Sequence, residues 1–342
     1  MVTDAHDVSD PIGYFIDDLM FHGKSDRTLD AYERVLRRFE HFLVERNESP
    51  VTASQRDCMA FVHSLRGSLA ESTVASYASY VHRFYSYMMQ TEALDRNPMA
   101  LVMTEMDESI STDPTRREIS IADMRRLVSR ITHPLEQAVV LTLLKTGLRV
   151  GECCNLDLRD CNLNAPADRK AYEYTHRPQL DGRPSSIFVS NDIDQGQEVN
   201  GERRTASNKR KRVTVIPVDE ELEETLVTWL MIRPDTPSPA EPLFIDTGRK
   251  WGHRLKPSQV RTFVQRHADA MGWYHVGSGA EENVTPHYFR HFFTTYLRDR
   301  TGDRGIVKYL RGDVAQDVID TYTHDWGDRV RTVYEKEIYS LM

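Results

Sequence analysis

The chain has 342 residues, of which 39% are hydrophobic and 28% are charged. This length predicts two domains, because single hydrophobic cores stop growing beyond roughly 250–300 residues. The composition argues against a disordered chain, and the net charge of −8 argues against nucleic-acid binding by the surface as a whole. Any nucleic-acid contact must therefore come from local basic patches, of which 201–217 and 249–266 are the clearest.

Targeting and metal signals are weak. No apolar run reaches the roughly 20 residues that span a bilayer, and 1–10 has no secretory pattern, so a cytoplasmic protein without membrane contact is expected. His287 and His291 stand four apart, but the glutamate of an HExxH zinc motif is missing, so no metal site is predicted. The cysteines lack CxxC spacing and are predicted to be structural thiols: Cys58, Cys153, Cys154 and Cys161.

The N-terminal region, 1–103, carries apolar side chains at three- and four-residue intervals, which is the spacing of amphipathic helices. Thr52 and Gln55 make a capping-box pattern that predicts a helix start. We expect four helices in this region, over 11–21, 25–47, from 52 onward, and 71–90. Together they predict a compact helical domain.

Residues 104–117 are polar and acidic, and they predict an interdomain linker. The second domain is expected over 118–342. An apolar helix is predicted over 135–144, and the Val- and Ile-rich segments 186–190 and 213–218 predict a small antiparallel sheet. The expected fold class is therefore mainly α, with a small antiparallel β-sheet in the second domain.

Arg149 and Glu152 form an Arg-x-x-Glu unit that follows a glycine turn. A helix that begins here would let Arg149 project from its first turn while Glu152 orients the guanidinium. The alternative is a capped helix with an ordinary intrahelical ion pair.

Residues 285–291, Thr-Pro-His-Tyr-Phe-Arg-His, form a second motif. Pro286 can start a helix, and His287 and Arg290 then share one face because they lie three residues apart. Arginine offers a planar fork that matches phosphate oxygens, and histidine can donate to another oxygen or move a proton near neutral pH. The motif predicts a phosphate site, with His291 in a supporting role. The alternative is a surface histidine beside a salt-bridged arginine.

A tyrosine near the C-terminus completes the pattern. Tyr322 alone would be interpreted as a core residue, but it stands last in the order Arg149, a lysine-bearing turn, His287, Arg290, Tyr322. This order resembles that of tyrosine recombinases and phage integrases over nearly the whole chain. The resemblance implies that Tyr322 attacks a DNA phosphate to form a 3′-phosphotyrosyl intermediate, and that no metal, ATP or other cofactor takes part. It also implies a two-domain architecture that clamps double-stranded DNA, and a C-terminal tail that docks on a neighbouring protomer of a tetramer.

The same resemblance points to a lysine. In that family a lysine on a mobile turn stands eight positions before a proline of the following strand, and Lys209 stands eight before Pro217. It would be the general acid that protonates the leaving 5′ oxygen. Lys211 is the competing candidate, and both could instead contact only the DNA backbone.

Two features depart from the family pattern. The family commonly has Gly-His nine residues before its tyrosine, whereas Gly312 is followed here by Asp313. An ionised aspartate cannot donate a hydrogen bond to a phosphate, so Asp313 is expected to orient another side chain, or His324 to compensate. Residues 162–205 are longer than the usual passage to the lysine turn and predict a surface insertion that can touch DNA.

Further arginines are candidate DNA contacts, with a solvated helix face as the alternative for those of the first domain. They are Arg34, Arg37, Arg38, Arg83, Arg203, Arg204, Arg210 and Arg212. Two other functions stay open beside the recombinase. A type IB topoisomerase would share the chemistry without paired sites, and a DNA-binding regulator could keep the fold without catalysis.

Overall fold

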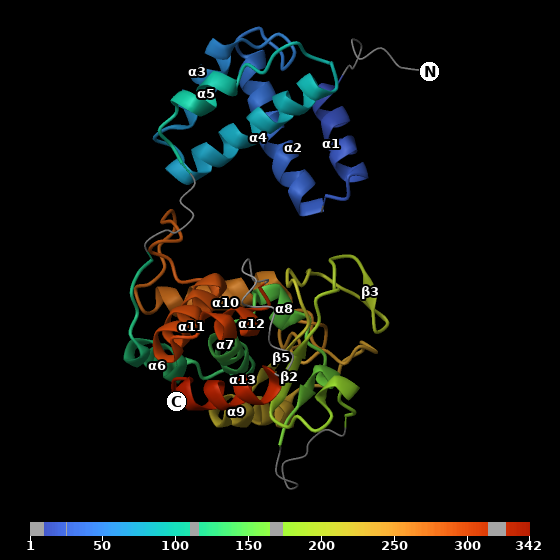
Figure 1. The fold of residues 1–342 in the computed structure, drawn as a ribbon, viewed down its shortest axis with the longest axis vertical. Coiled ribbons are helices and arrows are strands. Elements are labelled where there is room, and N and C mark those ends of the chain that lie inside the picture. Colours follow the sequence, from blue (N-terminus) through green and yellow to red (C-terminus); the bar gives the residue numbers. More distant parts are fainter. Residues whose placement is uncertain (1–9, 25, 110–115, 165–173, 314–325) are drawn as a thin grey trace. The chain divides into compact units, whose positions relative to one another are not determined.

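The protein forms two compact units, Met1–Pro114 and Thr115–Met342. The structure, a computed structural model, describes residues 10–24, 26–109, 116–164, 174–313 and 326–342 (Figure 1). Tyr322 and His324 lie outside these ranges. The boundary between the units falls inside the segment expected to be a linker. No helix in the described ranges is both long and apolar enough to cross a membrane.

The first unit is helical, as expected. Its described helices are α1 (Pro11–Phe21), α2 (Asp26–Val44), α3 (Gln55–Leu65), α4 (Glu71–Gln90) and α5 (Ala100–Glu105). Helices α1, α2 and α4 pack against one another (Figure 1). The core of this unit contains Phe15, Phe39 and Phe84. The short helix α5 adds to the four that the sequence predicts, because Met99 and Val102 are buried against the same core.

The capping box of α3 lies two residues later than expected. Ser54, not Thr52, is the N-cap: its hydroxyl accepts from the amide of Asp57, whose carboxylate accepts from the amide of Ser54. The hydroxyl of Thr52 donates to Glu48 in the preceding turn instead. Two overlapping capping patterns compete in this segment, and the one whose acidic partner completes the reciprocal bond prevails.

The second unit surrounds an apolar helix. Its described helices are α6 (Ile121–Arg130), α7 (Pro134–Thr146), α8 (Val150–Cys154), α9 (Glu220–Ile232), α10 (Pro257–Asp269), α11 (Pro286–Thr301), α12 (Arg304–Arg311) and α13 (Trp326–Glu337), with short 3₁₀ turns at Leu158–Asp160 and Pro178–Leu180. Helix α7 packs against α8, α9, α10 and α11, which explains its apolar sequence. It ends at Gly147, whose φ of +63° and close contact with the ring of Phe293 leave no room for a side chain.

The expected sheet is present. Strands β1 (Cys161–Asn162), β2 (Ser186–Val189) and β5 (Thr214–Pro217) form an antiparallel sheet in the order β1-β2-β5, with Ser186 opposite Pro217 and Val189 opposite Thr214. Between β2 and β5 the chain forms a separate hairpin of β3 (Glu198–Val199) and β4 (Glu202–Arg203). The mainly α fold with a small antiparallel sheet is therefore confirmed.

The described part of the C-terminal tail, 326–342, packs against its own unit. Helix α13 contacts β5 and α11 (Figure 1). Tyr334, Tyr339 and Leu341 are buried. The ammonium of Lys145, which is fully buried, lies 2.5 Å from the carbonyl oxygen of Tyr339. Two carboxylates of α9 and its N-cap, Asp219 at 2.6 Å and Glu221 at 2.7 Å, balance its charge.

Candidate active site

Arg149 is the N-cap of α8, immediately after the turn that ends α7. The carboxylate of Glu152, three residues into this helix, accepts from the backbone amide of Arg149 at 2.9 Å and from its Nη1 at 2.9 Å. Because the Glu152 side chain is fully buried, this pair fixes the guanidinium of Arg149 at the edge of the core.

Arg290 lies on the first turns of α11, which begins at Pro286 as the sequence predicts. The residue is only 2% exposed. Its Nη1 donates to the carbonyl oxygen of Gly147 at 2.7 Å and its Nη2 to that of Arg311 at 3.1 Å. Burial, together with the positive charge of Arg149, lowers the pKa of Arg290 to about 9, so the side chain remains a cation at neutral pH.

Asp313 brings the two arginines together. Its Oδ1 lies 3.2 Å from Nη2 of Arg149 and 3.1 Å from Nη2 of Arg290. Its Oδ2 lies 2.8 Å from Nε of Arg311, a cation that the sequence did not single out. The signal in the sequence that could have pointed to Arg311 is its position next to Gly312 and Asp313. The Asp313 carboxylate therefore contacts three guanidinium groups.

His287 lies one turn before Arg290 on α11. Desolvation lowers the pKa of its imidazole, and the guanidinium groups of Arg116 and Arg290 lower it further. The free site therefore favours neutral histidine at pH 7. Arg116 was assigned to the expected linker, but its Nη1 donates to the carbonyl oxygen of Ala280 in the second unit.

The segment that carries the candidate lysines is anchored on both sides of Lys209. The side chain of Asn208 accepts from Asn155 of the α8 C-cap at 2.9 Å, and Arg210 lies 3.4 Å from Glu152 of the same helix. Lys209 itself is exposed, and its ammonium has no hydrogen-bond or ion-pair partner among the described residues. Lys211 is also exposed, and its backbone amide donates to Gly312.

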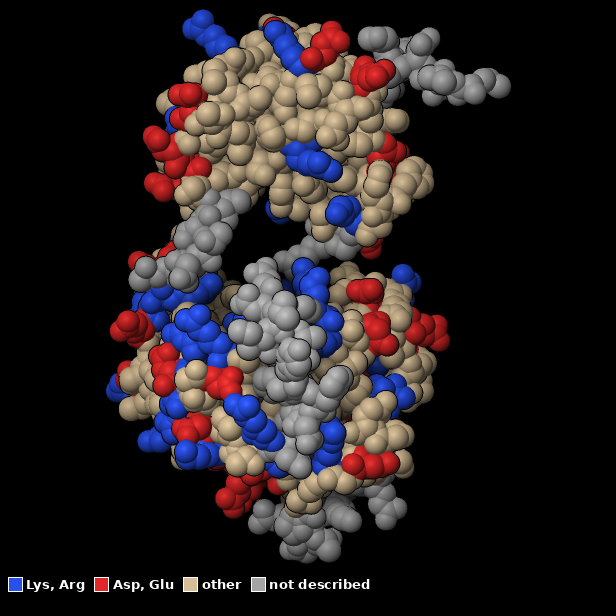
Figure 2. All heavy atoms as spheres, viewed as in Figure 1, with Lys and Arg blue, Asp and Glu red and all other residues tan. Residues whose placement is uncertain are grey.

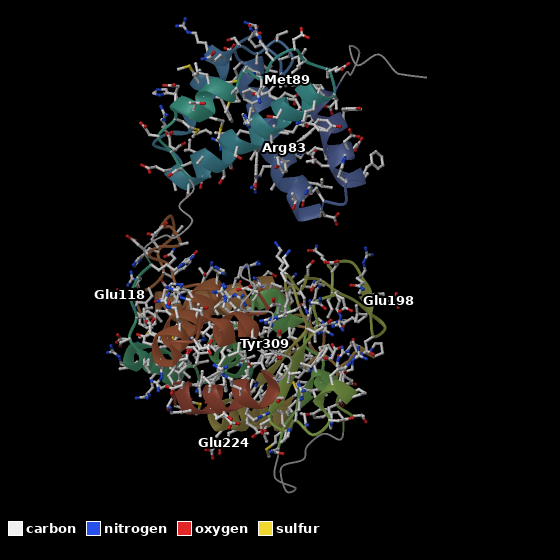
Figure 3. The ribbon with its side chains drawn as sticks, in the orientation of Figure 1. Arg83, Met89, Glu118, Glu198, Glu224 and Tyr309 are labelled. Carbon is white, nitrogen blue, oxygen red and sulfur yellow. The ribbon has the colours of Figure 1, made fainter. Side chains whose placement is uncertain are left out.

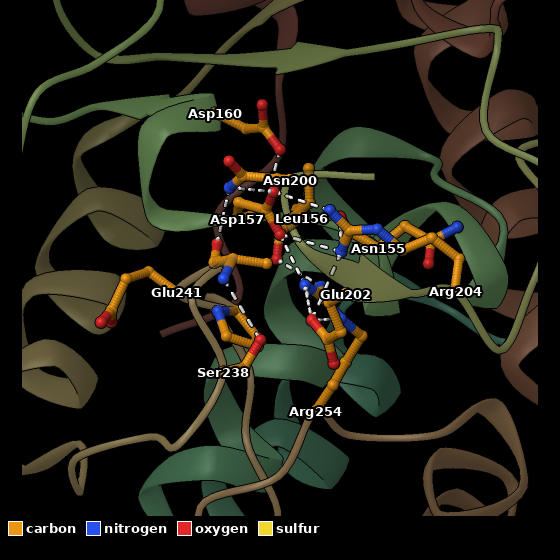
Figure 4. Close-up of polar contacts among 12 residues, drawn as sticks. Asn155, Leu156, Asp157, Asp160, Asn200, Glu202, Arg204, Ser238, Glu241 and Arg254 are labelled. Carbon is orange, nitrogen blue, oxygen red and sulfur yellow. Dashed lines mark hydrogen bonds and ion pairs between the residues drawn. The ribbon is translucent and has the colours of Figure 1, made fainter. Parts of the chain in front are cut away.

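Two of the candidate DNA contacts, Arg204 and Arg210, are buried in this structure. Arg210 is 3% exposed. Its guanidinium forms an ion pair with Glu152 and donates to the carbonyl oxygen of Leu310. Arg204 is 1% exposed and forms a two-point ion pair with Asp157, at 2.9 and 2.8 Å (Figure 4). Arg254 meets the same carboxylate at 2.6 Å and Glu202 at 2.6 Å, so this network fastens the β3–β4 hairpin to the core (Figure 4).

The other arginine candidates divide by exposure. Arg34, Arg38, Arg83 and Arg203 are exposed, and Figure 3 labels Arg83 on α4. Arg37 is paired with Asp10 at 2.5 Å and with Glu40 at 3.1 Å. Arg212 lies over the ring of Tyr309, 4.8 Å from its centroid. The visible face of the second unit carries many Lys and Arg groups interspersed with acidic ones (Figure 2).

His291, the supporting candidate of the same motif, is half-buried and packs beside the ring of Tyr288. Within the described residues, Glu152 contacts Arg149, and Asp313 contacts both Arg149 and Arg290. His287 lies one turn before Arg290 on α11. The expected nucleophile, Tyr322, and His324 fall outside those residues.

Comparison with known proteins identifies the domains of the chain. The phage integrase N-terminal SAM-like domain matches residues 12–92, and the phage integrase family matches residues 189–327. The chain therefore has a helical SAM-like domain followed by an integrase catalytic domain, which is the architecture of a tyrosine recombinase.

Full-length relatives and solved structures point the same way. Tyrosine recombinase XerA of Pyrococcus horikoshii is 26% identical over 334 residues, covering 96% of this chain and 93% of the relative. Tyrosine recombinase XerD of Shewanella oneidensis is 25% identical over 333 residues, or 95% of each chain. The Tn1549 transposon integrase, solved with a circular intermediate DNA, shares the fold with a TM-score of 0.64 at 17% identity, over 95% of this chain and 98% of that one. This chain belongs to the phage integrase family and is a site-specific recombinase.

Proposed function

We propose that this recombinase cleaves double-stranded DNA by attack of Tyr322 on a phosphodiester, forming a 3′-phosphotyrosyl intermediate and releasing a 5′ hydroxyl. The observation that carries the proposal is the meeting of Arg149 and Arg290, which come from distant parts of the chain and direct one nitrogen each at the same anionic oxygen. Such fixed cationic donors stabilise the negative charge that gathers on the non-bridging oxygens in the transition state.

The remaining roles follow from the side-chain chemistry. His287 in its neutral form donates one ring hydrogen to a further phosphate oxygen. Lys209, exposed on an anchored segment, protonates the departing 5′ oxygen as general acid, with Lys211 as the alternative. The phosphotyrosyl bond retains the energy of the broken phosphodiester, so rejoining needs no ATP, and the arginines supply the charge for which other nucleases use a metal ion.

Tyr322 is favoured over the two tyrosines that follow it. The hydroxyl of Tyr334 donates to the carbonyl oxygen of Lys145 at 3.0 Å, and that of Tyr339 donates to Leu144 at 2.5 Å. Burial raises the pKa of both phenols. Both are therefore engaged in the core of the second unit.

We further propose that the protein acts in the cytoplasm as a tetramer on DNA. The exposed Arg34, Arg38 and Arg83 would contact phosphates from the first unit, and Arg203 from the second. The solved Tn1549 integrase complex contains DNA, which supports the choice of partner. The tetramer rests on the family resemblance. The names of the relatives favour the recombinase over a type IB topoisomerase.

A suicide-substrate experiment tests the reaction. Duplexes that bind the protein are selected from a random pool, and a nick is placed one nucleotide from each candidate cleavage position, so that the leaving strand diffuses away. Wild type is expected to give a covalent adduct in the presence of a metal chelator and without ATP, and Tyr322→Phe to give none while it still binds the duplex. Binding by wild type without any adduct would favour the catalytically inactive regulator.

A further inference from the structure

The Asp313 carboxylate lies at the point where the two proposed phosphate ligands direct their remaining donors. Nη1 of each arginine donates to the scaffold, that of Arg149 to Glu152 at 2.9 Å and that of Arg290 to the carbonyl oxygen of Gly147 at 2.7 Å. Nη2 of Arg290 donates in addition to the carbonyl oxygen of Arg311 at 3.1 Å. The Nη2 nitrogen of each donates to Oδ1 of Asp313, at 3.2 and 3.1 Å. A single carboxylate oxygen therefore occupies the point at which the two guanidinium groups converge.

The chemistry of this position is that of an anion site. The second carboxylate oxygen lies 2.8 Å from Nε of Arg311, so three guanidinium groups share one carboxylate. A phosphate offers the same planar donors two or three oxygens, with equal or greater negative charge. A phosphate oxygen that bonds both Nη2 nitrogens must take the place of Oδ1.

Charge balance shows why the site holds a carboxylate in the absence of a ligand. Among the residues that the structure describes, ion pairs connect Arg149, Arg210, Arg290 and Arg311 to two acids, Glu152 and Asp313. Glu152 is fully buried and anchors its arginines to the core, whereas the Asp313 side chain is 28% exposed. Of the two acids, Asp313 is the one that can move into water when another anion arrives.

We propose that Asp313 is a positioning residue that acts as an internal substitute for the scissile phosphate. It holds the Nη2 groups of Arg149 and Arg290 together in the DNA-free protein, and it releases them when a phosphate binds. This role rests on the proposed function. It gives the replacement of the family's histidine by Asp313 a definite effect on phosphate binding. Because a phosphate must displace the Asp313 carboxylate, phosphate alone binds weakly. The other contacts with DNA have to supply the free energy that this displacement costs.

Inorganic phosphate is the probe that isolates this step. The full-length protein is titrated with phosphate at constant ionic strength, and the dissociation constant is obtained from the shift of the thermal midpoint. Asp313→Asn is expected to bind phosphate at least tenfold more tightly than wild type, which corresponds to about 1.4 kcal/mol. Asp313→Glu keeps the charge and is expected to remain within about threefold of wild type.

Two controls place the effect at this site. Asp299→Asn makes the same change of charge at an exposed pair with Arg298, and it is expected to leave phosphate affinity unchanged. In the double variant Asp313→Asn, Arg149→Gln, the gain should disappear. An unchanged or weaker affinity in Asp313→Asn would overturn the proposal, as would a gain that survives in the double variant or also appears in Asp299→Asn.

The outcome is separable from that of the proposed reaction, because phosphate titration does not require DNA cleavage. If wild type forms the Tyr322 adduct and Asp313→Asn shows no gain, the recombinase chemistry stands and the role of Asp313 fails. If the gain appears and no adduct forms on any selected duplex, the anion site stands and the proposed reaction fails.

Discussion

Replacing Glu152 by glutamine tests the claim that one buried carboxylate supports both Arg149 and the lysine-bearing segment. Glutamine keeps the shape and one acceptor oxygen but removes the charge that faces Arg149 at 2.9 Å and Arg210 at 3.4 Å. Coulomb's law with an effective dielectric constant of about 20 gives roughly 5 kcal/mol for a pair at this separation, before desolvation is subtracted. Removing one partner of a buried pair costs about 3–5 kcal/mol in measured cases. We therefore expect a loss of about 3 kcal/mol, the lower end, because one hydrogen bond to Arg149 survives.

Urea unfolding of the full chain, followed by tryptophan fluorescence, measures this loss. In a separate thermal melt, about 3 kcal/mol corresponds to a fall of about 6–12 °C in the melting temperature of a unit of this size. The matched control is Glu335→Gln, which removes the charge of a half-exposed pair with Arg331 and should cost less than about 0.5 kcal/mol. A loss below about 1 kcal/mol in Glu152→Gln would refute the reasoning, because it would mean that Arg149 and Arg210 are held by their other contacts.

Three further outcomes are expected. Lys145→Met removes the buried cation that Asp219 and Glu221 share, together with its bond to the carbonyl oxygen of Tyr339. It should therefore cost about 3–5 kcal/mol and expose the chain end to carboxypeptidase, and a tail as resistant as in wild type would contradict this. The lowered pKa of His287 makes protonation of its imidazole costly in the folded state, so its contribution to stability is present above the ordinary pKa near 6.5 and is lost as the pH falls. Wild type should therefore lose stability relative to His287→Gln between about pH 7.5 and about pH 5.5. Parallel pH profiles of the two proteins would count against this explanation. Arg204→Ala should lower the free energy of unfolding in urea by about 3–5 kcal/mol, because it removes one of the ion-pair partners of Asp157. Arg203→Ala should change this free energy by less than about 0.5 kcal/mol and weaken DNA binding. Equal effects of the two variants on stability would be inconsistent with the burial of Arg204 and the exposure of Arg203.

Elements with strong periodicity were predictable from the sequence. Helices α1 and α4 have the expected bounds, because both alternate apolar and polar faces at helical spacing. The segments 186–190 and 213–218 became paired strands, since β-branched residues between turn formers leave few alternatives.

The pairing of charges could not be read from the sequence. Arg204 stands in a basic run typical of a nucleic-acid contact, but its partner Asp157 comes from a distant segment, and no local pattern connects them. Arg210 and Glu152 are separated in the same way. The departure at Asp313 is visible in the sequence, whereas its contacts with the arginines depend on where α8 and α11 begin and where α12 ends.

The most direct test of the central claim is to locate the bond between protein and DNA. The adduct from a nicked duplex is digested with nuclease and trypsin, and the modified peptide is sequenced by mass spectrometry. Trypsin should release residues 312–329, in which Tyr322 is the only tyrosine. We predict that this peptide carries a nucleotide joined through its 3′ phosphate to Tyr322. A nucleotide on Tyr334 or Tyr339, or a linkage through a 5′ phosphate, would contradict the account.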